Sequence, residues 1–532
     1  MSVSSKQSGD EAEAMDFAGC IAANGRTMPD KPALVLDGRV LTWGEFTRDV
    51  HRTAHALHAL GVGKGDKVAM LAATSMEYVT LFAGAVVAGA CAVPLSAMMQ
   101  GEAVEMMIRD CDARVLAVSR STVDQVEPFA GRLDEILPGG FIGLDCSDER
   151  WRDFHAWIAE QPDSAPGIEV EPDDPFDLIY SSGTTGTPKG ILHPHAMRAG
   201  HLQRMGRFGL GEEAITLVST PLYSNTTLVA MLPTLAGGGT AVLMRKFDVA
   251  EFLRLAQDEK VTHAMLVPVQ YQRILAHPDF GRYDLSSFRA KLSTSAPLRR
   301  SVIEDANRRW PGELIEIYGL TEGGVTTILN TREFPDKLDT VGRPSETVEM
   351  LLVDEQGRPV PQGEIGEVVG RSHAMMTGYY KRPEQTRALI WKDENGRVFY
   401  RTGDMGRLDE DGFLQLLDRK KDMIISGGFN IYATDLEQML LRHAAVLDAA
   451  VIGVSSERWG ETPVALVVLA EGADLSEESL REWANERLGK AQRLSAVQFI
   501  DSLPRSTIGK VLKRELRETY LRRNQAKTDK AE

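Results

Sequence analysis

The sequence predicts an α/β protein with a large N-terminal domain of stacked α/β layers, a β-rich subdomain and a small C-terminal α/β domain. In the first part of the chain, short apolar runs alternate with helical stretches, which is typical of layered folds with parallel strands. From residue 347, short strands are separated by Asp/Gly turns at 354–357 and 409–412, which indicates a β-rich unit. After residue 421, helices and strands alternate again.

These changes of pattern give the expected segments. They are a disordered tail at 1–14, an N-terminal domain at 15–420 that includes the β-rich subdomain at 347–420, a C-terminal domain at 421–520, and a disordered tail at 521–532. The expected helices span 45–60, 77–88, 249–259, 435–441 and 477–487. The expected strands span 67–71, 91–95, 176–180, 215–219, 240–243, 263–267, 314–317, 350–353, 367–370, 412–417, 448–452, 464–469 and 496–499.

Composition narrows the class of protein. The net charge of −16 over 532 residues argues against a general binder of nucleic acid or anionic membranes, which needs a basic face. The most apolar run, 81–95, is short and contains Pro94, so we expect a packed helix leading into a strand and no stable membrane insertion. Residues 1–13 lack the basic and apolar regions of a secretory signal, and the four cysteines show no CxxC spacing. A cytoplasmic setting is expected.

The strongest motif is the stretch from Tyr180 to Gly190, Tyr-Ser-Ser-Gly-Thr-Thr-Gly-Thr-Pro-Lys-Gly, which follows an apolar strand. Its three glycines allow a tight turn in which successive backbone N–H groups point into one concavity. Five hydroxyls and Lys189 add donors, and no acidic residue is present, so the loop suits a polyphosphate. Because Lys189 is followed by glycine and not by Ser or Thr, the loop is not a Walker A motif.

Two further motifs carry acidic side chains. Thr321 and Glu322 follow the strand 314–317, where a hydroxyl and a carboxylate suit an α-phosphate contact and a Mg²⁺ ligand. Asp404 ends the string Tyr-Arg-Thr-Gly-Asp at 400–404, where a carboxylate on a tight turn suits two ribose hydroxyls. Taken alone, the first is also consistent with a strand-to-helix cap and the second with an ordinary turn.

In this order, the motifs resemble those of the adenylate-forming superfamily, which includes acyl-CoA and aryl-CoA ligases, luciferases and the adenylation domains of peptide synthetases. The resemblance extends from about Asp30 to about Arg517. It implies an AMP-forming carboxylic acid–CoA ligase that uses ATP, Mg²⁺ and CoA, forms an acyl-adenylate and then a thioester. It also implies that the C-terminal domain is mobile and rotates about the hinge residue Lys421 between the two half-reactions.

The resemblance also assigns roles to individual residues. The implied nucleotide-binding residues are Ser181, Ser182, Gly183, Thr184, Thr185, Gly186, Thr187, Lys189, Ser295, Ala296, Pro297, Tyr318, Gly319, Thr321, Asp404 and Arg419. The implied catalytic residues are Lys189, Thr321, Glu322 and Lys510, with Glu322 and Thr184 as metal ligands. Lys510 ends the string 504–510, which resembles the motif whose lysine drives adenylation. A lysine between a carboxylate and an α-phosphate offsets the repulsion of the two anions. Ser295 replaces a glycine that is usual in the family.

The sequence motifs that indicate the binding sites for CoA and for the acid are less specific. Gly427, Gly428 and Trp459 resemble residues that contact pantetheine in aryl-CoA ligases, and the acyl pocket is expected at Tyr223, Ser224, Asn225, Ile317 and Gly319. Ser224 stands where many members have histidine, so no catalytic histidine is assigned. Ile317 is expected to narrow the pocket and to favour a flat aryl or cyclic acid, while a medium-to-long-chain fatty acid stays open. Ordinary core packing remains the alternative for Ile317 and Trp459.

Two other functions remain in view. The first is an adenylation enzyme that loads a carrier-protein thiol instead of free CoA. The second is a non-catalytic acyl-nucleotide binding module, against which the presence of Lys510 and Glu322 argues. The expected partners are a small carboxylic acid, ATP and CoA, without nucleic acid, and the chain is expected to be a monomer or a homodimer.

Overall fold

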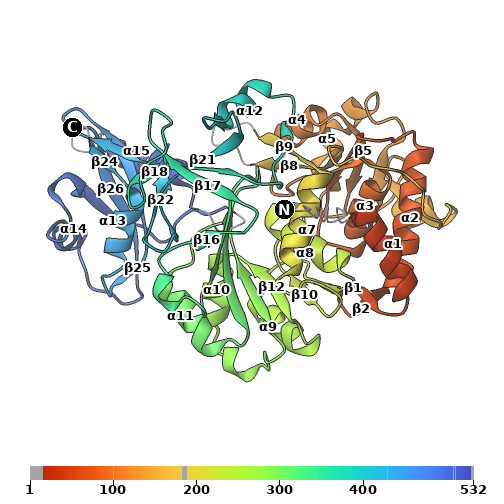
Figure 1. Ribbon diagram of the computed structural model, residues 1–532, viewed down its shortest axis with the longest axis horizontal. Helices are drawn as coiled ribbons and strands as arrows, with labels where there is room; N and C mark the ends of the chain where they lie inside the picture. The colour runs from red at the N-terminus through yellow and green to blue at the C-terminus, as the bar shows by residue number, and fades with distance from the viewer. Residues whose placement is uncertain are drawn as a thin grey trace, which may run out of the picture.

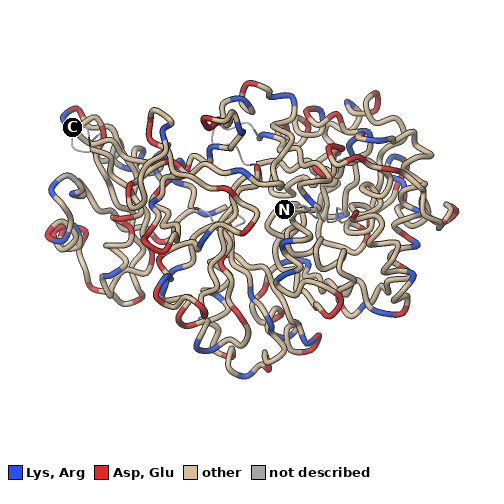
Figure 2. Tube along the Cα trace, in the orientation of Figure 1, with Lys and Arg blue, Asp and Glu red and all other residues tan. Residues whose placement is uncertain are grey.

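The structure is a computed structural model, and it describes residues 16–99, 101–181, 188–427, 429–506, 509 and 511–528. Within these residues the chain forms four β-sheets, two large ones in the N-terminal part, one in the β-rich part and one near the C-terminus (Figure 1). Acidic and basic residues are interspersed along the visible trace (Figure 2). In the part of the chain that the structure describes, no helix combines the length and the apolar content that crossing a membrane requires.

The first large sheet has nine strands and a parallel centre. In spatial order they are β16 (Arg343–Pro344), β15 (Thr326–Asn330), β14 (Glu313–Gly319), β13 (Ala290–Ser293), β12 (His263–Leu266), β10 (Ile215–Val218), β11 (Thr240–Leu243), β1 (Pro32–Leu36) and β2 (Arg39–Thr42). The pairs from β14 to β1 are parallel, and β2, β15 and β16 pair antiparallel at the two edges. The carboxyl ends of β13 and β14 therefore lie at the same edge of this sheet.

The second large sheet has eight strands. In spatial order they are β19 (Gly378–Tyr379), β9 (Lys189–Pro194), β8 (Pro175–Ser181), β4 (Cys91–Pro94), β3 (Lys67–Leu71), β5 (Ala113–Val118), β6 (Phe141–Gly143) and β7 (Arg152–Asp153). β8 and β9 form an antiparallel hairpin, and β19 joins it although its residues lie in the predicted β-rich segment. The second sheet therefore receives a strand from far along the chain.

Helices cover both faces of the large sheets. Helices α1 (Phe17–Thr27), α2 (Trp43–Ala59), α3 (Met76–Val87) and α8 (Asn225–Ala236) pack in one apolar core with strands of both sheets. Helices α9 (Val249–Asp258), α10 (Pro268–Leu275) and α11 (Arg300–Arg309) cover the outer face of the nine-stranded sheet, and α4 (Glu102–Asp110) and α5 (Glu127–Ala130) cover that of the other sheet. Parallel strands buried on both faces read as continuous apolar runs, which is why the sequence predicts them well.

The β-rich part and the C-terminal part each have a five-stranded sheet. The first contains β17 (Glu349–Val353), β18 (Ile365–Arg371), β20 (Ile390–Lys392), β21 (Val398–Leu408) and β22 (Leu414–Arg419), and the second β23 (Ile424–Ser426), β24 (Phe429–Ile431), β25 (Val446–Ser456), β26 (Gly460–Leu469) and β27 (Ala496–Phe499). The remaining helices are α6 (Phe154–Ala159), α7 (His195–Gly206), α12 (Pro383–Leu389), α13 (Ala433–Leu440), α14 (Glu477–Asn485) and α15 (Lys513–Thr528). The mixed α/β class with a large N-terminal and a small C-terminal domain is confirmed (Figure 1).

Two predictions about apolar and polar segments have clear outcomes. The run 81–95 is the buried helix α3 followed by β4, as predicted, and every residue of α3 is buried. The disordered tail predicted from 521 is wrong for residues 521–528, because α15 extends to Thr528. Leu, Arg, Gln, Ala and Lys in this stretch are good helix formers, and a helix that has already begun adds residues at little cost.

Candidate active site

The predicted phosphate loop connects β8 and β9. The two strands are in register so that Ser181 lies opposite Lys189 and Tyr180 opposite Gly190. Both ends of the loop are therefore held at one point of the eight-stranded sheet. Six of the predicted phosphate-loop residues lie outside the described residues: Ser182, Gly183, Thr184, Thr185, Gly186 and Thr187. Of the predicted phosphate ligands, Ser181 and Lys189 can be placed, and both lie at the mouth of the hairpin.

Thr321 and Glu322 follow β14 and lie close to this hairpin. The Tyr379 hydroxyl donates a 2.7 Å hydrogen bond to Glu322 Oε1, and the Met376 N–H donates to the Glu322 carbonyl oxygen at 3.0 Å. The Lys189 ammonium lies 5.2 Å from the centre of the Tyr379 ring, within range of a cation–π contact. Burial, reinforced by the Glu322 carboxylate, raises the pKa of Tyr379, so its hydroxyl keeps the proton that it donates. Tyr379 thus holds the predicted phosphate lysine and the predicted metal ligand together.

A fully buried polar network lies beneath the two motifs. His193 on β9 faces Asp177 on β8, with 2.6 Å between Nδ1 and Oδ1, and its Nε2 donates to the Thr321 carbonyl oxygen at 2.8 Å. The Arg198 guanidinium from α7 pairs with the other Asp177 oxygen and donates to Asn225 Oδ1 at 2.9 Å. Burial alone would raise the pKa of Asp177, but Arg198 and His193 lower it, so the carboxylate is charged. The network ties the strands of the phosphate loop to the Thr321 turn.

The predicted ribose ligand Asp404 lies between two donors. Tyr318 on β14 donates its hydroxyl to Asp404 Oδ2 at 2.7 Å, and Arg419 Nε lies 3.1 Å from Oδ1. Asp404 on β21 is directly opposite Arg419 on β22, which is why these two side chains meet. Burial, together with the adjacent Asp404 carboxylate, raises the pKa of Tyr318 well above its ordinary value. The structure therefore brings three of the predicted nucleotide residues into direct contact.

The segment 294–298, which contains the predicted nucleotide-binding residues Ser295, Ala296 and Pro297, follows β13 at the same sheet edge. The family resemblance implies that it lies beside the adenine, and it is called the adenine-side loop below. Ser295 has φ of +77°, a left-handed conformation that favours glycine, so the chain keeps the backbone shape although the residue differs from the usual glycine. Its hydroxyl lies 2.8 Å from the Thr226 hydroxyl on α8, which gives the strained residue a partner. Ala296 and Pro297 follow, and the Leu298 N–H donates to Glu316 Oε1 at 2.8 Å. Burial raises the pKa of Glu316 to about 8.

The predicted acyl-pocket residues lie at the start of α8 and the end of β14. Ser224 is the N-cap residue of α8 and is buried, and Tyr223 and Asn225 beside it are half-buried. The oxygen of Asn225 accepts from Arg198, so this polar group is oriented by the buried network. Ile317 packs against an apolar cluster, and Gly319 at the strand end is exposed. The same cluster also contains Phe208, Val229, Ala230 and Met265.

The predicted hinge and CoA residues lie in the C-terminal part. Lys421 is exposed in the turn after β22. Gly427 has φ of +56° and packs flat on Trp459, since a Cβ there would lie 2.9 Å from Cε3 of the indole. Trp459 is 47% exposed and its other neighbour is the Arg458 guanidinium, 4.7 Å from the ring. This exposure does not fit ordinary core packing, which was the alternative interpretation of Trp459.

Two further predicted residues, Gly428 and Lys510, lie outside the described residues.

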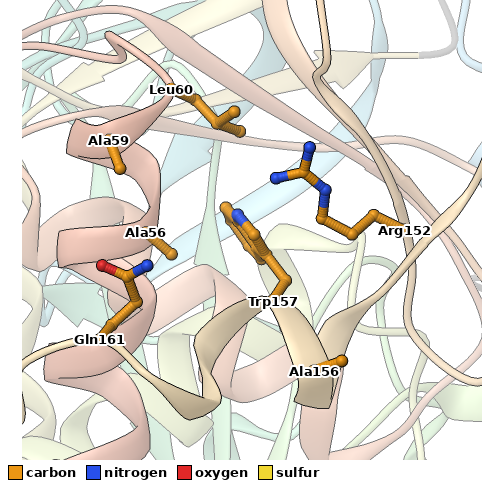
Figure 3. Close-up of a pocket in the computed structure, with 7 residues that line it drawn as sticks. All are labelled: Ala56, Ala59, Leu60, Arg152, Ala156, Trp157 and Gln161. Carbon is orange, nitrogen blue, oxygen red and sulfur yellow. The ribbon is translucent and has the colours of Figure 1, made fainter.

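Two further features were compared with the predicted site, namely clusters of possible metal ligands and cavities. Among the described residues no group of three or more His, Cys, Asp and Glu side chains could hold a metal ion. One carboxylate, Glu322, beside a phosphate loop fits Mg²⁺, which is usually bound by one or two carboxylates together with substrate phosphates. A cavity of about 320 Å³ is lined by seven residues, none of which is a predicted site residue: Ala56, Ala59, Leu60, Arg152, Ala156, Trp157 and Gln161 (Figure 3). It plays no part in this site.

Sequence reasoning missed Tyr379 and the buried Asp177, His193 and Arg198. One signal was available: Asp177 interrupts the apolar run 176–180, and a charged residue inside a buried strand requires a partner. The position of that partner, 21 residues along the chain on a helix, was not readable.

Comparison with known proteins shows which family the chain belongs to. Residues 21–380 match the family model described as AMP-binding enzyme, and residues 435–510 match the model described as AMP-binding enzyme C-terminal domain. The chain is 35% identical over 502 residues to a feruloyl-CoA synthase of Amycolatopsis sp, covering 93% of this chain and 97% of that protein. It is 31% identical to the fatty acid–[acyl-carrier-protein] ligase ScoC of Streptomyces coeruleorubidus, covering 92% and 94%. The solved structure of ATP-bound MatB from Rhodopseudomonas palustris is similar with a TM-score of 0.84 and 27% identity, covering 94% of this chain and 99% of that one.

Proposed function

The chain belongs to the AMP-binding enzyme family as an ATP-dependent, adenylate-forming acid–CoA ligase, and from this premise we propose which residues perform the reaction and which acid it takes. In the first half-reaction a carboxylate oxygen of the acid attacks the α-phosphorus of ATP and pyrophosphate leaves. In the second half-reaction the CoA thiol attacks the acyl carbonyl, the thioester forms and AMP leaves. No covalent intermediate with the protein is required.

The observation that carries the residue assignment is that Tyr379 contacts both Lys189, through its ring, and Glu322, through its hydroxyl. A cation for the phosphates and a carboxylate for Mg²⁺ are needed within a few ångströms of each other when a nucleotide phosphate is the electrophile. Tyr379 contacts both residues, so it links the two groups before substrate binds. Mg²⁺, when bound, neutralises charge on the phosphates, and Thr321 contacts the α-phosphate beside it.

The other nucleotide contacts follow from the same arrangement. Asp404 binds the ribose hydroxyls, because its carboxylate is held in place by Tyr318 and Arg419 and faces the same edge as the adenine-side loop. Lys510 bridges the attacking carboxylate and the α-phosphate in the first half-reaction only. The C-terminal domain then turns about Lys421, and Trp459 and the Gly427 segment approach the pantetheine arm of CoA.

For the acid we propose a flat aromatic or cyclic carboxylic acid. Ile317 and its apolar neighbours give a floor without charge, and the half-buried Tyr223 gives an aromatic wall. The feruloyl-CoA synthase relative, named for an aromatic acid, supports this choice. A fatty acid of medium or long chain is the second candidate, and the relative ScoC, named for fatty acids, supports it.

The thiol acceptor has a second candidate as well. ScoC is named for ligation to an acyl-carrier protein, whose thiol, like that of CoA, ends a pantetheine arm. An exposed tryptophan packed on a glycine suits the arm in either case. We propose free CoA because the feruloyl-CoA synthase, at 35% identity, is named for CoA. We also propose a cytoplasmic location, which the lack of CxxC spacing among the four cysteines predicts.

The test is a screen of pyrophosphate release with ATP, Mg²⁺ and one acid at a time. Benzoate, cinnamate and octanoate are compared first, each with CoA and with a phosphopantetheinylated carrier protein. We expect the highest kcat/KM with cinnamate or benzoate and CoA. Preference for octanoate overturns the choice of acid, preference for the carrier protein overturns the choice of thiol, and release independent of any acid overturns the residue assignment.

A further inference from the structure

The interface between the C-terminal part and the adenine-side loop contains a chain of charged contacts. Arg299 follows that loop directly and is the N-cap residue of α11. Its guanidinium donates to the Leu447 carbonyl oxygen at 2.9 Å and pairs with Asp448 Oδ1 on β25. Figure 1 shows β25 and α11 next to each other. The Arg299 and Asp448 side chains are 31% and 20% exposed, so the pair is partly shielded from water.

A local irregularity of β25 makes this contact. The register of β25 against β26 shifts between Val446 and Asp448, which is where a β-bulge turns neighbouring groups away from the sheet. Leu447 is 60% exposed, and its carbonyl and the following carboxylate both meet the Arg299 guanidinium. The bulge presents two acceptors to one planar donor, an arrangement that fixes orientation as well as distance.

The second oxygen of Asp448 continues the chain of contacts. Arg505 Nη2 donates to Asp448 Oδ2 at 2.6 Å, and Arg505 Nη1 donates to the Gly509 carbonyl oxygen at 2.8 Å. Gly509 is buried, and a Cβ there would lie 3.2 Å from Val269 Cγ1 of α10, so Gly509 fits closely against the N-terminal part. Gly509 immediately precedes the predicted adenylation lysine.

We propose that Asp448 is a positioning residue for the adenylation step, acting with Arg299 and Arg505. The inference rests on the proposed function, in which the lysine after Gly509 acts in the first half-reaction only. Arg299 belongs to the N-terminal part, whereas Asp448 and Arg505 both move with the C-terminal part. Rotation of that part breaks the Arg299 contacts and leaves the Asp448–Arg505 pair intact. The Arg299 contacts therefore stabilise only the orientation that adenylation uses.

The neighbouring residue provides a matched control. Arg300 has the same side chain, one position along, and pairs with Asp339, which lies within the N-terminal part, at 2.6 Å. Removing Arg300 deletes a similar ion pair at the same helix end without touching the C-terminal part. Any difference between Arg299→Ala and Arg300→Ala is then due to the contact across the interface.

The experiment measures each half-reaction in the full chain. ATP–pyrophosphate exchange with cinnamate reports adenylation, and thioester formation from supplied cinnamoyl-AMP and CoA reports the second step. We expect Arg299→Ala to slow exchange by at least about fivefold, as loss of a partly shielded charged contact does, and to leave the second step unchanged or faster. Arg299→Lys recovers part of the loss, Asp448→Ala exceeds it, and Arg300→Ala resembles the unchanged protein in both assays.

A readout without catalysis accompanies the assays. Lys420 and Lys421 are exposed at the junction, and trypsin should cleave after them faster in Arg299→Ala than in Arg300→Ala, because the undocked C-terminal part leaves the junction more accessible. Equal exchange rates and equal cleavage rates in the two variants overturn the inference, as does equal slowing of both half-reactions by Arg299→Ala. Failure of the proposed function is a different outcome, namely no exchange in the unchanged protein with any acid, and the cleavage comparison still decides the inference in that case.

Discussion

The hydroxyl of Tyr379 is the contact whose removal tests the site most sharply. In Tyr379→Phe the ring that faces Lys189 stays, and only the 2.7 Å hydrogen bond to Glu322 is lost. A hydrogen bond to a charged group contributes about 1.5–3 kcal/mol, and each 1.36 kcal/mol is a factor of ten in rate. If Glu322 must be held in place to bind the metal, kcat/KM for ATP in the exchange reaction should fall about 10- to 150-fold. The Mg²⁺ concentration that gives half of the maximal rate should rise.

The adjacent residue again supplies the control. The half-buried Tyr380 donates its hydroxyl to Asp112 at 2.8 Å and not to Glu322. Tyr380→Phe removes a hydrogen bond of the same kind from the same strand end. The assay is acid-dependent ATP–pyrophosphate exchange over a series of Mg²⁺ concentrations, with thermal unfolding of both variants as a check on folding. If Tyr379→Phe stays within twofold of Tyr380→Phe at every Mg²⁺ concentration, Tyr379 does not position the metal ligand and the reasoning fails.

Three further predictions concern the lysines, the acyl pocket and pH. Lys510→Ala should abolish adenylation and spare thioester formation from a supplied acyl-adenylate, whereas Lys421→Pro, which restricts φ and removes an N–H at the hinge, should do the converse. Equal losses in both half-reactions for either variant would contradict the assigned roles. Ile317→Gly should change the relative kcat/KM for benzoate, cinnamate and octanoate by at least about tenfold, because several methylene contacts are removed. Unchanged ratios would show that Ile317 does not touch the acid. Since burial raises the pKa of Glu316 to about 8 from an ordinary value of 4.5, the folded state keeps a proton that the unfolded chain releases, and stability falls as pH rises between those values. Glu316→Gln retains an acceptor for the Leu298 N–H, and its gain in Tm over the unchanged protein should be larger at pH 8 than at pH 5, while equal gains would refute the assignment of a buried neutral acid.

Local pattern was sufficient for much of the fold. The strands at 67–71, 240–243 and 496–499 begin and end where they are predicted. For the first two, a short apolar run bounded by turns determines the strand position through burial of both faces, whereas 496–499 is only partly buried. Motifs for phosphate, ribose and metal can also be predicted from the sequence, because each consists of a few adjacent residues whose donors and acceptors match one part of a nucleotide. The prediction of a disordered tail from 521 is wrong for the last part of α15, because a polar composition predicts disorder although these residues are good helix formers.

The sequence by itself therefore determined the fold class and the family, and it predicted a chemistry for each separate motif. Only the tertiary structure decided how the motifs meet. Tyr379 reaches Glu322 across 57 residues because β19, two residues long and without a readable period, adds to the β8–β9 hairpin. Arg299 reaches Asp448 across 149 residues because a bulge in β25 lies against α11. Such contacts depend on strand order and on the docking of distant segments, and neither leaves a periodic signal in the sequence. A buried charge requires a partner close in space, but that partner can lie at any distance along the chain.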